Sequence, residues 1–234
     1  MRASVSEIKT AHTSLPWSLR LVARLVSALF NPLLMPTYLL ALLIIVNPYI
    51  FGVNGLGDSL SKLLMLRVFL STFFIPLVAI VMLRATGLLQ SFELRDSQER
   101  IAPYIITGVF YLWMFRNFYS NSQIPTAYTT FMLGITIALF MTFFINIFSR
   151  ISAHTVGMGA LVGMVLITML LFSYDTFIFG NRYLTMSTLL IAVLLLAGLV
   201  GTARQILYPY TPMDLYGGYF VGFLAQFIAL RFIF

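Results

Sequence analysis

One polar stretch, residues 203–218, holds several of the side chains in this 234-residue chain that could do chemistry. It lies between two long apolar runs and contains Arg204, Tyr210 and Asp214. An arginine guanidinium forms strong, charge-assisted hydrogen bonds with phosphate oxygens. The stretch is therefore the first candidate for an anion-binding site.

A second polar turn, Ser152-Ala153-His154, opens an earlier apolar run, and Arg150 lies just before it. Histidine as a residue type titrates near neutral pH, so His154 could protonate a leaving oxygen or attack phosphorus. The alternative is that a single histidine near a membrane surface only packs or forms hydrogen bonds. The residues alone leave both interpretations open.

Both polar turns carry the signals of a helix start. Thr211 is a typical N-cap, Pro212 suits the first helical position, and Asp214 completes a capping box. Asp214 therefore also has a purely structural interpretation. Ser152 is a second expected N-cap. The free N–H groups and positive dipole ends of two helix starts favour an anion between them, close to Arg204.

The composition determines which elements must position these residues. The chain is 60% hydrophobic and 9% charged, whereas a soluble domain has about 25% charged residues. A membrane span needs about 20 apolar residues. We predict an all-α integral membrane protein with about seven transmembrane helices, forming one polytopic domain over 25–234 after a polar, interfacial segment over 1–24. The expected spans are 25–50, 63–84, 102–118, 127–149, 154–174, 183–203 and 212–233.

Composition also limits cofactors and partners. The chain has no cysteine, which excludes disulfides and thiolate metal ligands, and its two histidines are too few for a histidine-rich metal site. The net charge of +7 is ordinary for a membrane protein with basic flanks. We expect no metal, no cofactor and no nucleic-acid partner. Membrane lipids are the expected partners.

With seven spans, the candidate polar turns all lie on the same side as the N-terminus. These turns cover residues 85–101, 150–153 and 204–211. That side carries nine of the basic residues and the other side five, which favours a cytoplasmic location. Arg100, Arg150 and Arg204 are themselves site candidates, and without them the count is six against five. The charges alone therefore leave the orientation open.

Three further patterns concern the backbone and the loops. Asn31-Pro32 and Pro36 predict a kink in the first span, either as simple packing or as a lateral opening for lipid. The charged stretch 93–100 either caps the third span or brings Arg95 or Arg100 over an anion. Small residues recur on the last three spans and predict close helix packing. These residues are Ala153, Gly157, Ala160, Gly163, Gly198, Gly201, Gly218 and Gly222.

Taken together, the polar residues resemble a known family. Ile151-Ser152-Ala153-His154 is similar to the P-S-G-H motif of the type 2 phosphatidic acid phosphatase superfamily, the membrane lipid-phosphate phosphatases. Arg204, five residues, Tyr210, three residues and Asp214 reproduce the spacing of that family's S-R-x5-H-x3-D motif. The resemblance covers residues 130–225. It implies that the last four helices form a bundle like that of the lipid phosphatases.

The resemblance also implies roles. In that family the reaction is metal-independent, and by analogy His154 would protonate the leaving group. Arg204 and Ser152 would bind the phosphate oxygens, and Asp214 would orient the nucleophile. The nucleophile position, a histidine in the family, is Tyr210 in this chain.

The remaining positions match the family less closely. Its first motif, K-x6-R-P, has only loose counterparts here, with Arg150 and Arg100 as the candidate phosphate ligands. Ile151, Ala153 and Ala203 replace the proline, glycine and serine of the two better-matched motifs. A neutral phenol is a weak nucleophile, so the change to Tyr210 affects catalysis more than the fold.

Two functions follow as expectations, and the residues do not decide whether the protein is an enzyme. The first is hydrolysis of lipid phosphates or polyprenyl diphosphates, with His154 or Tyr210 as the nucleophile. The second is a catalytically degenerate relative that binds lipid headgroups or serves as a structural subunit beside other membrane proteins. A transporter is disfavoured because no acidic residue lies in the middle of a span. The expected location is the bacterial inner (plasma) membrane.

Overall fold

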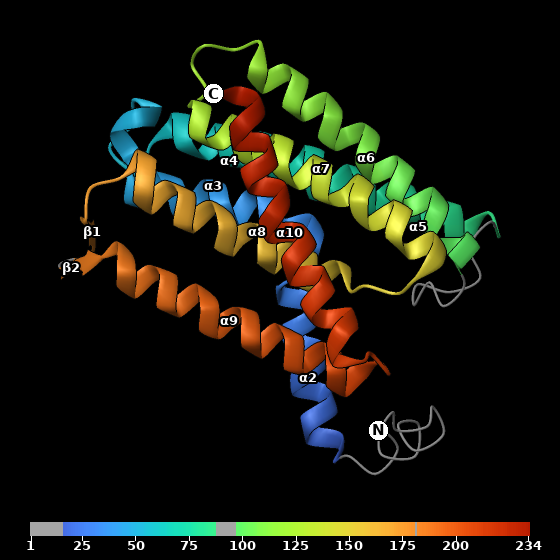
Figure 1. The fold of residues 1–234 in the computed structure, drawn as a ribbon. Coiled ribbons are helices and arrows are strands. Elements are labelled where there is room, and N and C mark those ends of the chain that lie inside the picture. The colour runs from blue at the N-terminus through green and yellow to red at the C-terminus, as the bar shows by residue number, and fades with distance from the viewer. Residues whose placement is uncertain (1–15, 88–96, 181) are drawn as a thin grey trace.

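The computed structural model describes residues 16–87, 97–180 and 182–234, with the side chains of 97–100 excluded. Nearly all of the described chain is helical (Figure 1). The first half contains α2 (Trp17–Leu29), η1 (Pro32–Leu34), α3 (Met35–Val46), η2 (Pro48–Phe51), α4 (Ser59–Phe69), η3 (Leu70–Phe74), α5 (Ile75–Ala85) and α6 (Ser97–Tyr119). The second half contains α7 (Thr126–Phe148), α8 (Ala153–Ile167), η4 (Thr168–Phe172), β1 (Thr176–Phe179), β2 (Arg182–Thr185), α9 (Met186–Leu207) and α10 (Pro212–Ile233).

Within the residues that the structure describes, six helical stretches are long and apolar enough to cross a membrane, which confirms an all-α integral membrane protein. They are Trp17–Val46, Ser59–Ala85, Thr126–Phe148, Ala153–Phe172, Met186–Leu207 and Pro212–Ile233. The expected span at 102–118 corresponds to α6, which is 23 residues long, the same length as α7. It is not among the six because Pro103, Arg116 and Asn117 lower its hydropathy.

The first of these stretches is broken in the middle, as the prolines predict. The Phe30 N–H closes α2 on the Val26 carbonyl, and Pro32 has no N–H with which to continue the helix. The Asn31 side chain accepts a hydrogen bond from the Leu33 N–H at 3.0 Å and starts the short helix η1. The chain re-enters an α-helix at Met35. The expected start near residue 25 lies inside α2, which already begins at Trp17.

The polar turns gather at one end of the bundle. Figure 1 places there the start of α2, the α7–α8 connection and the α9–α10 connection, while the β hairpin and the C-terminus lie at the opposite end. This arrangement confirms that the turns 150–153 and 204–211 share one face. The charged residues 93–96 lie outside the described residues.

A β hairpin replaces the expected start of the sixth span. Strands β1 and β2 pair antiparallel with Thr176 opposite Thr185, and Gly180 supplies the left-handed backbone of the turn at φ +62°. Residue 183 was expected in a helix, but aromatic and β-branched residues favour a strand. Helix α9 therefore begins only at Met186, where Thr185 accepts from the Thr188 N–H at 3.2 Å.

Glycines bring α8 and α10 into backbone contact, as the small-residue pattern predicts. A Cβ atom on Gly222 would lie 2.7 Å from the Ala160 nitrogen and closer still to the Val156 carbonyl oxygen. A Cβ on Gly159 would clash with the backbone of Tyr219. The two helices therefore lie too close together for any side chain at these positions. Gly198 behaves differently, because a Cβ there would meet nothing within 4 Å.

This contrast yields a stability prediction. We expect Gly222→Ala to lower the free energy of unfolding by about 1–3 kcal/mol, because the added methyl meets rigid backbone rather than a movable side chain. Gly198→Ala should change it by no more than about 1 kcal/mol, and in the stabilising direction. Unfolding in detergent micelles measures both. Equal midpoints for the two variants would contradict the close α8–α10 contact.

Candidate functional site

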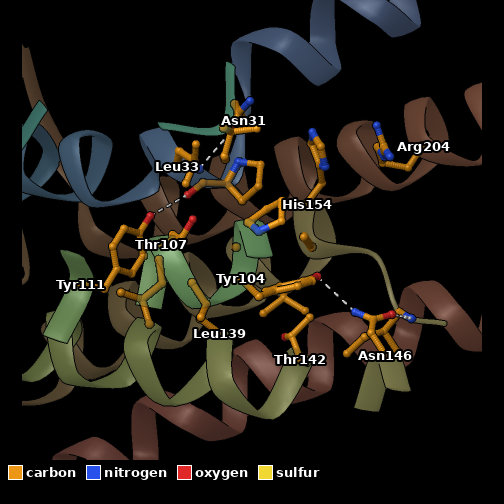
Figure 2. Close-up of a pocket in the computed structure, with 18 of the residues that line it drawn as sticks. Asn31, Leu33, Tyr104, Thr107, Tyr111, Leu139, Thr142, Asn146, His154 and Arg204 are labelled. Carbon is orange, nitrogen blue, oxygen red and sulfur yellow. Dashed lines mark hydrogen bonds between the residues drawn. The ribbon is translucent and has the colours of Figure 1, made fainter. Parts of the chain in front are cut away.

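A cavity of 320 Å³ opens at the end of the bundle where the polar turns meet (Figure 2). Its walls come from the α2–α3 break, α5, α6, α7, the start of α8 and the α9–α10 turn. Figure 2 shows His154 and Arg204 on one side and Tyr104 and Asn146 on the other. Apolar side chains complete the lining, among them Leu33, Ile135 and Leu139.

Three of the predicted site residues line this cavity together: His154, Arg204 and Tyr210. They come from α8, from the last turn of α9 and from the turn before α10. Ser152, Asp214 and Arg150 do not line it. Arg100 lies in the first turn of α6, and its side chain is outside the described residues.

Arg204 is held over two tyrosine rings. Its guanidinium carbon lies 4.2 Å from the centre of the Tyr208 ring and 5.8 Å from that of Tyr210. These are cation–π distances, and they fix the charge at the cavity wall. The Nε atom is buried and has no hydrogen-bond partner among the described residues. A buried hydrogen-bond donor without a partner costs free energy, so the Nε–H of Arg204 favours the binding of an anion that can accept its hydrogen bond.

His154 lies in the first turn of α8, and its Nε2 is 3.1 Å from the carbonyl oxygen of Ser27 on α2. A carbonyl oxygen can only accept, so Nε2 carries the proton and donates. In the neutral ring Nδ1 is then the acceptor. In the ligand-free protein, the Nε2–H of His154 therefore already donates a hydrogen bond to a backbone carbonyl.

Ser152 occupies the predicted N-cap position of α8, but its hydroxyl forms no capping bond. The residue is fully buried, and its Oγ has no partner within the described part of the chain. Its carbonyl oxygen instead accepts from the Thr155 hydroxyl at 2.9 Å. The turn before it is fixed by the Ile151 N–H, which donates to Asn146 Oδ1 at 3.0 Å. Arg150, just before this turn, is exposed.

Asp214 closes the predicted capping box. Its carboxylate accepts from the Thr211 N–H at 2.7 Å, and its own N–H donates to the Thr211 hydroxyl at 3.3 Å. Pro212 takes the first helical position, as expected. The carboxylate thus fixes the start of α10 and with it the turn that carries Tyr210.

The structure adds residues that the sequence analysis did not single out for the site. Asn146 Nδ2 donates to the Tyr104 hydroxyl at 3.1 Å, and both residues line the cavity. Asn146 gave a signal, because an amide near the end of an apolar span is unusual. Tyr104 gave none, since tyrosines are common at membrane interfaces. Tyr208 lies within the polar stretch 203–218. It contacts Arg204 at the cavity because of the orientation of the last turn of α9, which the sequence does not give.

Chemically, the cavity offers one guanidinium, one imidazole and several phenols next to apolar walls. Residues 16–87, 97–180 and 182–234 contain no group of three or more histidine, cysteine, aspartate or glutamate side chains placed to hold a metal ion. The charged and apolar parts of the lining suit a molecule that has an anionic group attached to a hydrocarbon chain.

We compared the chain with protein-family models, with curated proteins and with solved structures, and none of the three comparisons found a match. The resemblance to the type 2 phosphatidic acid phosphatases therefore depends on the motif residues and their spacing. The functional argument proceeds from these motifs together with the geometry of the cavity.

The capping box yields a second prediction. We expect Asp214→Ala to lower the free energy of unfolding by about 1 kcal/mol, because the Thr211 N–H loses its acceptor. Thr211→Ala should have a similar effect, and Thr211→Ser, which keeps the hydroxyl, should have almost none. Anion binding in the cavity should persist in all three variants. The structural role of Asp214 is wrong if Asp214→Ala unfolds like the wild type but no longer binds an anion.

Proposed function

We propose that this protein is a lipid-phosphate phosphatase-like protein of the bacterial inner membrane. In this proposal the cavity binds the phosphate of a lipid phosphate or a polyprenyl diphosphate. The observation that carries the proposal is the buried, unpartnered Nε of Arg204 in a cavity that His154 and Tyr210 also line. The motif spacing supports it, since these residues match the positions that contact phosphate in the resembling family.

The position of the cavity supports a lipid ligand. It extends from the start of α8 and the end of α9, where lipid headgroups meet the ends of membrane spans, to Ile135 near the middle of α7. Leu33, Ile135 and Leu139 give part of its wall the character of a hydrocarbon-chain site. If α6 is taken as a seventh span, this face is also the one with nine of the basic residues, which favours the cytoplasmic side of the membrane.

Binding without turnover is the second candidate function, and specific contacts favour it. The Asp214 carboxylate is engaged in the capping box and does not line the cavity. The His154 proton is engaged by the Ser27 carbonyl. In the hydrolytic version, His154 would have to release Ser27 and give its Nε2 proton to the leaving oxygen as the bond from phosphorus to that oxygen breaks. The Tyr210 oxygen would form the new bond to phosphorus, and the phenol proton would pass to His154 Nδ1.

Titration with short-chain phosphatidic acid tests binding, with phosphatidylcholine as the reference lipid. We expect Arg204→Gln to weaken binding by about tenfold or more, because a hydrogen bond to a charged group contributes about 1.5–3 kcal/mol. Arg150→Gln is the matched control, since it removes an exposed arginine outside the cavity. Equal losses for the two variants, or no preference over phosphatidylcholine, would contradict the proposed site.

Phosphate release separates hydrolysis from binding. The substrates are phosphatidic acid, phosphatidylglycerol phosphate and undecaprenyl diphosphate, and His154→Ala and Tyr210→His are measured beside the wild type. Release that His154→Ala abolishes supports an enzyme that works with Tyr210. A silent wild type with a Tyr210→His variant that gains activity supports an intact pocket without its nucleophile. If all of them bind lipid phosphate and release nothing, the binding function stands alone.

A further inference from the structure

The break in the first span leaves several carbonyl oxygens near the end of α2 without helical partners, and those of Ser27 and Leu29 are two of them. In a continuous helix, the Ser27 oxygen would accept from the N–H of residue 31 and the Leu29 oxygen from that of residue 33. The chain is extended at Asn31, and the Leu33 N–H donates to the Asn31 side chain. Lipid offers no donors, so both oxygens need partners from the protein.

Two side chains supply these partners. The Tyr38 hydroxyl, in the first turn of α3, donates to the Leu29 oxygen at 2.7 Å. His154 Nε2 donates to the Ser27 oxygen at 3.1 Å. The first bond is local to the break, whereas the second joins the end of α2 to the start of α8. His154 also lines the cavity, so the same side chain serves the helix and the site.

Helix α2 is also attached to the bundle through α9, against which it packs with the small buried residues Ala23 and Ser27. Its large apolar side chains point outward, with Val22 55%, Leu25 62% and Leu29 59% exposed. The hydrogen bond from His154 adds an attachment to α8, on the side of the cavity, that the packing against α9 does not supply.

We propose that the Ser27–His154 hydrogen bond is a latch that holds α2 against the bundle, and that a phosphate bound at Arg204 releases it. Helix α2 then turns about residues 30–34 and opens the cavity sideways to the bilayer. The latch depends on the contacts described above. Its release by a ligand also depends on the proposed binding of phosphate in the cavity.

The competition for one proton explains the release. Figure 2 shows Arg204 beside His154, so a phosphate held by Arg204 lies next to the imidazole. A phosphate oxygen is a charged acceptor and binds an N–H more strongly than a neutral carbonyl does. Asn31, Pro32 and Leu33 also line the cavity, so the occupant contacts the hinge directly. A lipid that enters from the bilayer would thus stabilise the open position of α2.

The absence of cysteine makes the movement measurable, because any introduced cysteine is labelled alone. Spin labels at Val22→Cys and Phe148→Cys report α2 against the end of α7, where both native side chains are exposed. Labels at Phe148→Cys and Met213→Cys form a control pair that does not include α2. Distances between labels are measured by double electron–electron resonance in phosphatidylcholine nanodiscs, without anionic lipid.

In this ligand-free experiment, His154→Leu should give the α2 pair a second, displaced distance population and leave the control pair unchanged. His154→Gln should restore the single population, because the glutamine amide can donate to Ser27 from the same position. Tyr128→Phe is the matched control. It removes a 2.9 Å bond to the Pro36 oxygen, which lies within helix α3. A single, unchanged population in His154→Leu would overturn the latch. If His154→Leu disturbs the control pair, His154→Phe takes its place.

A second experiment adds phosphatidic acid to the nanodiscs. The wild type should gain the displaced α2 population, and Arg204→Gln should not. Phosphatidic acid that binds in the titration but leaves α2 in place would overturn the ligand-driven release. Phosphatidic acid that does not bind at all would overturn the proposed function, while the ligand-free experiment would still decide whether the latch exists.

Discussion

The close approach of α8 and α10 is the contact on which the site depends. Gly222 and Gly159 let the two backbones meet, so the start of α8 and the turn before α10 lie side by side. His154 is in the first of these segments and Tyr210 in the second. Because the contact is made by backbone atoms, it leaves little freedom to slide. The small residues therefore determine the relative position of two segments that line the cavity, independently of the polar side chains.

The second constraint is that lipid cannot satisfy a broken backbone. Pro32 interrupts the first span, and the freed Ser27 oxygen is satisfied by a side chain of the site itself. The same requirement explains why the Asn31 side chain caps the short helix that follows. Residues that match catalytic positions of the resembling family thus also stabilise the fold. Asp214 is another example, because its carboxylate starts α10.

Patterns within a few residues were predictable from the sequence, and contacts between distant residues were not. The apolar runs indicated the spans, and the Thr211–Asp214 capping box and the break at Pro32 could be predicted from neighbours in the chain. The β hairpin was missed, because its aromatic and apolar residues look like the edge of a span. The Ser27–His154 bond joins residues 127 positions apart, and no local pattern indicates it. The position of Asp214 outside the cavity likewise depends on how α10 is rotated about its axis, which no local pattern indicates.

The central claim is that a lipid phosphate occupies the cavity with its hydrocarbon chain among the apolar lining residues. Photo-crosslinking with phosphatidic acid that carries a photoreactive acyl chain, followed by peptide mapping, tests this claim most directly. The account predicts crosslinks to Leu33, Ile135 or Leu139 that unlabelled phosphatidic acid suppresses and phosphatidylcholine does not. Crosslinks confined to outward-facing residues such as Leu195 and Phe220, with no competition by phosphatidic acid, would contradict it.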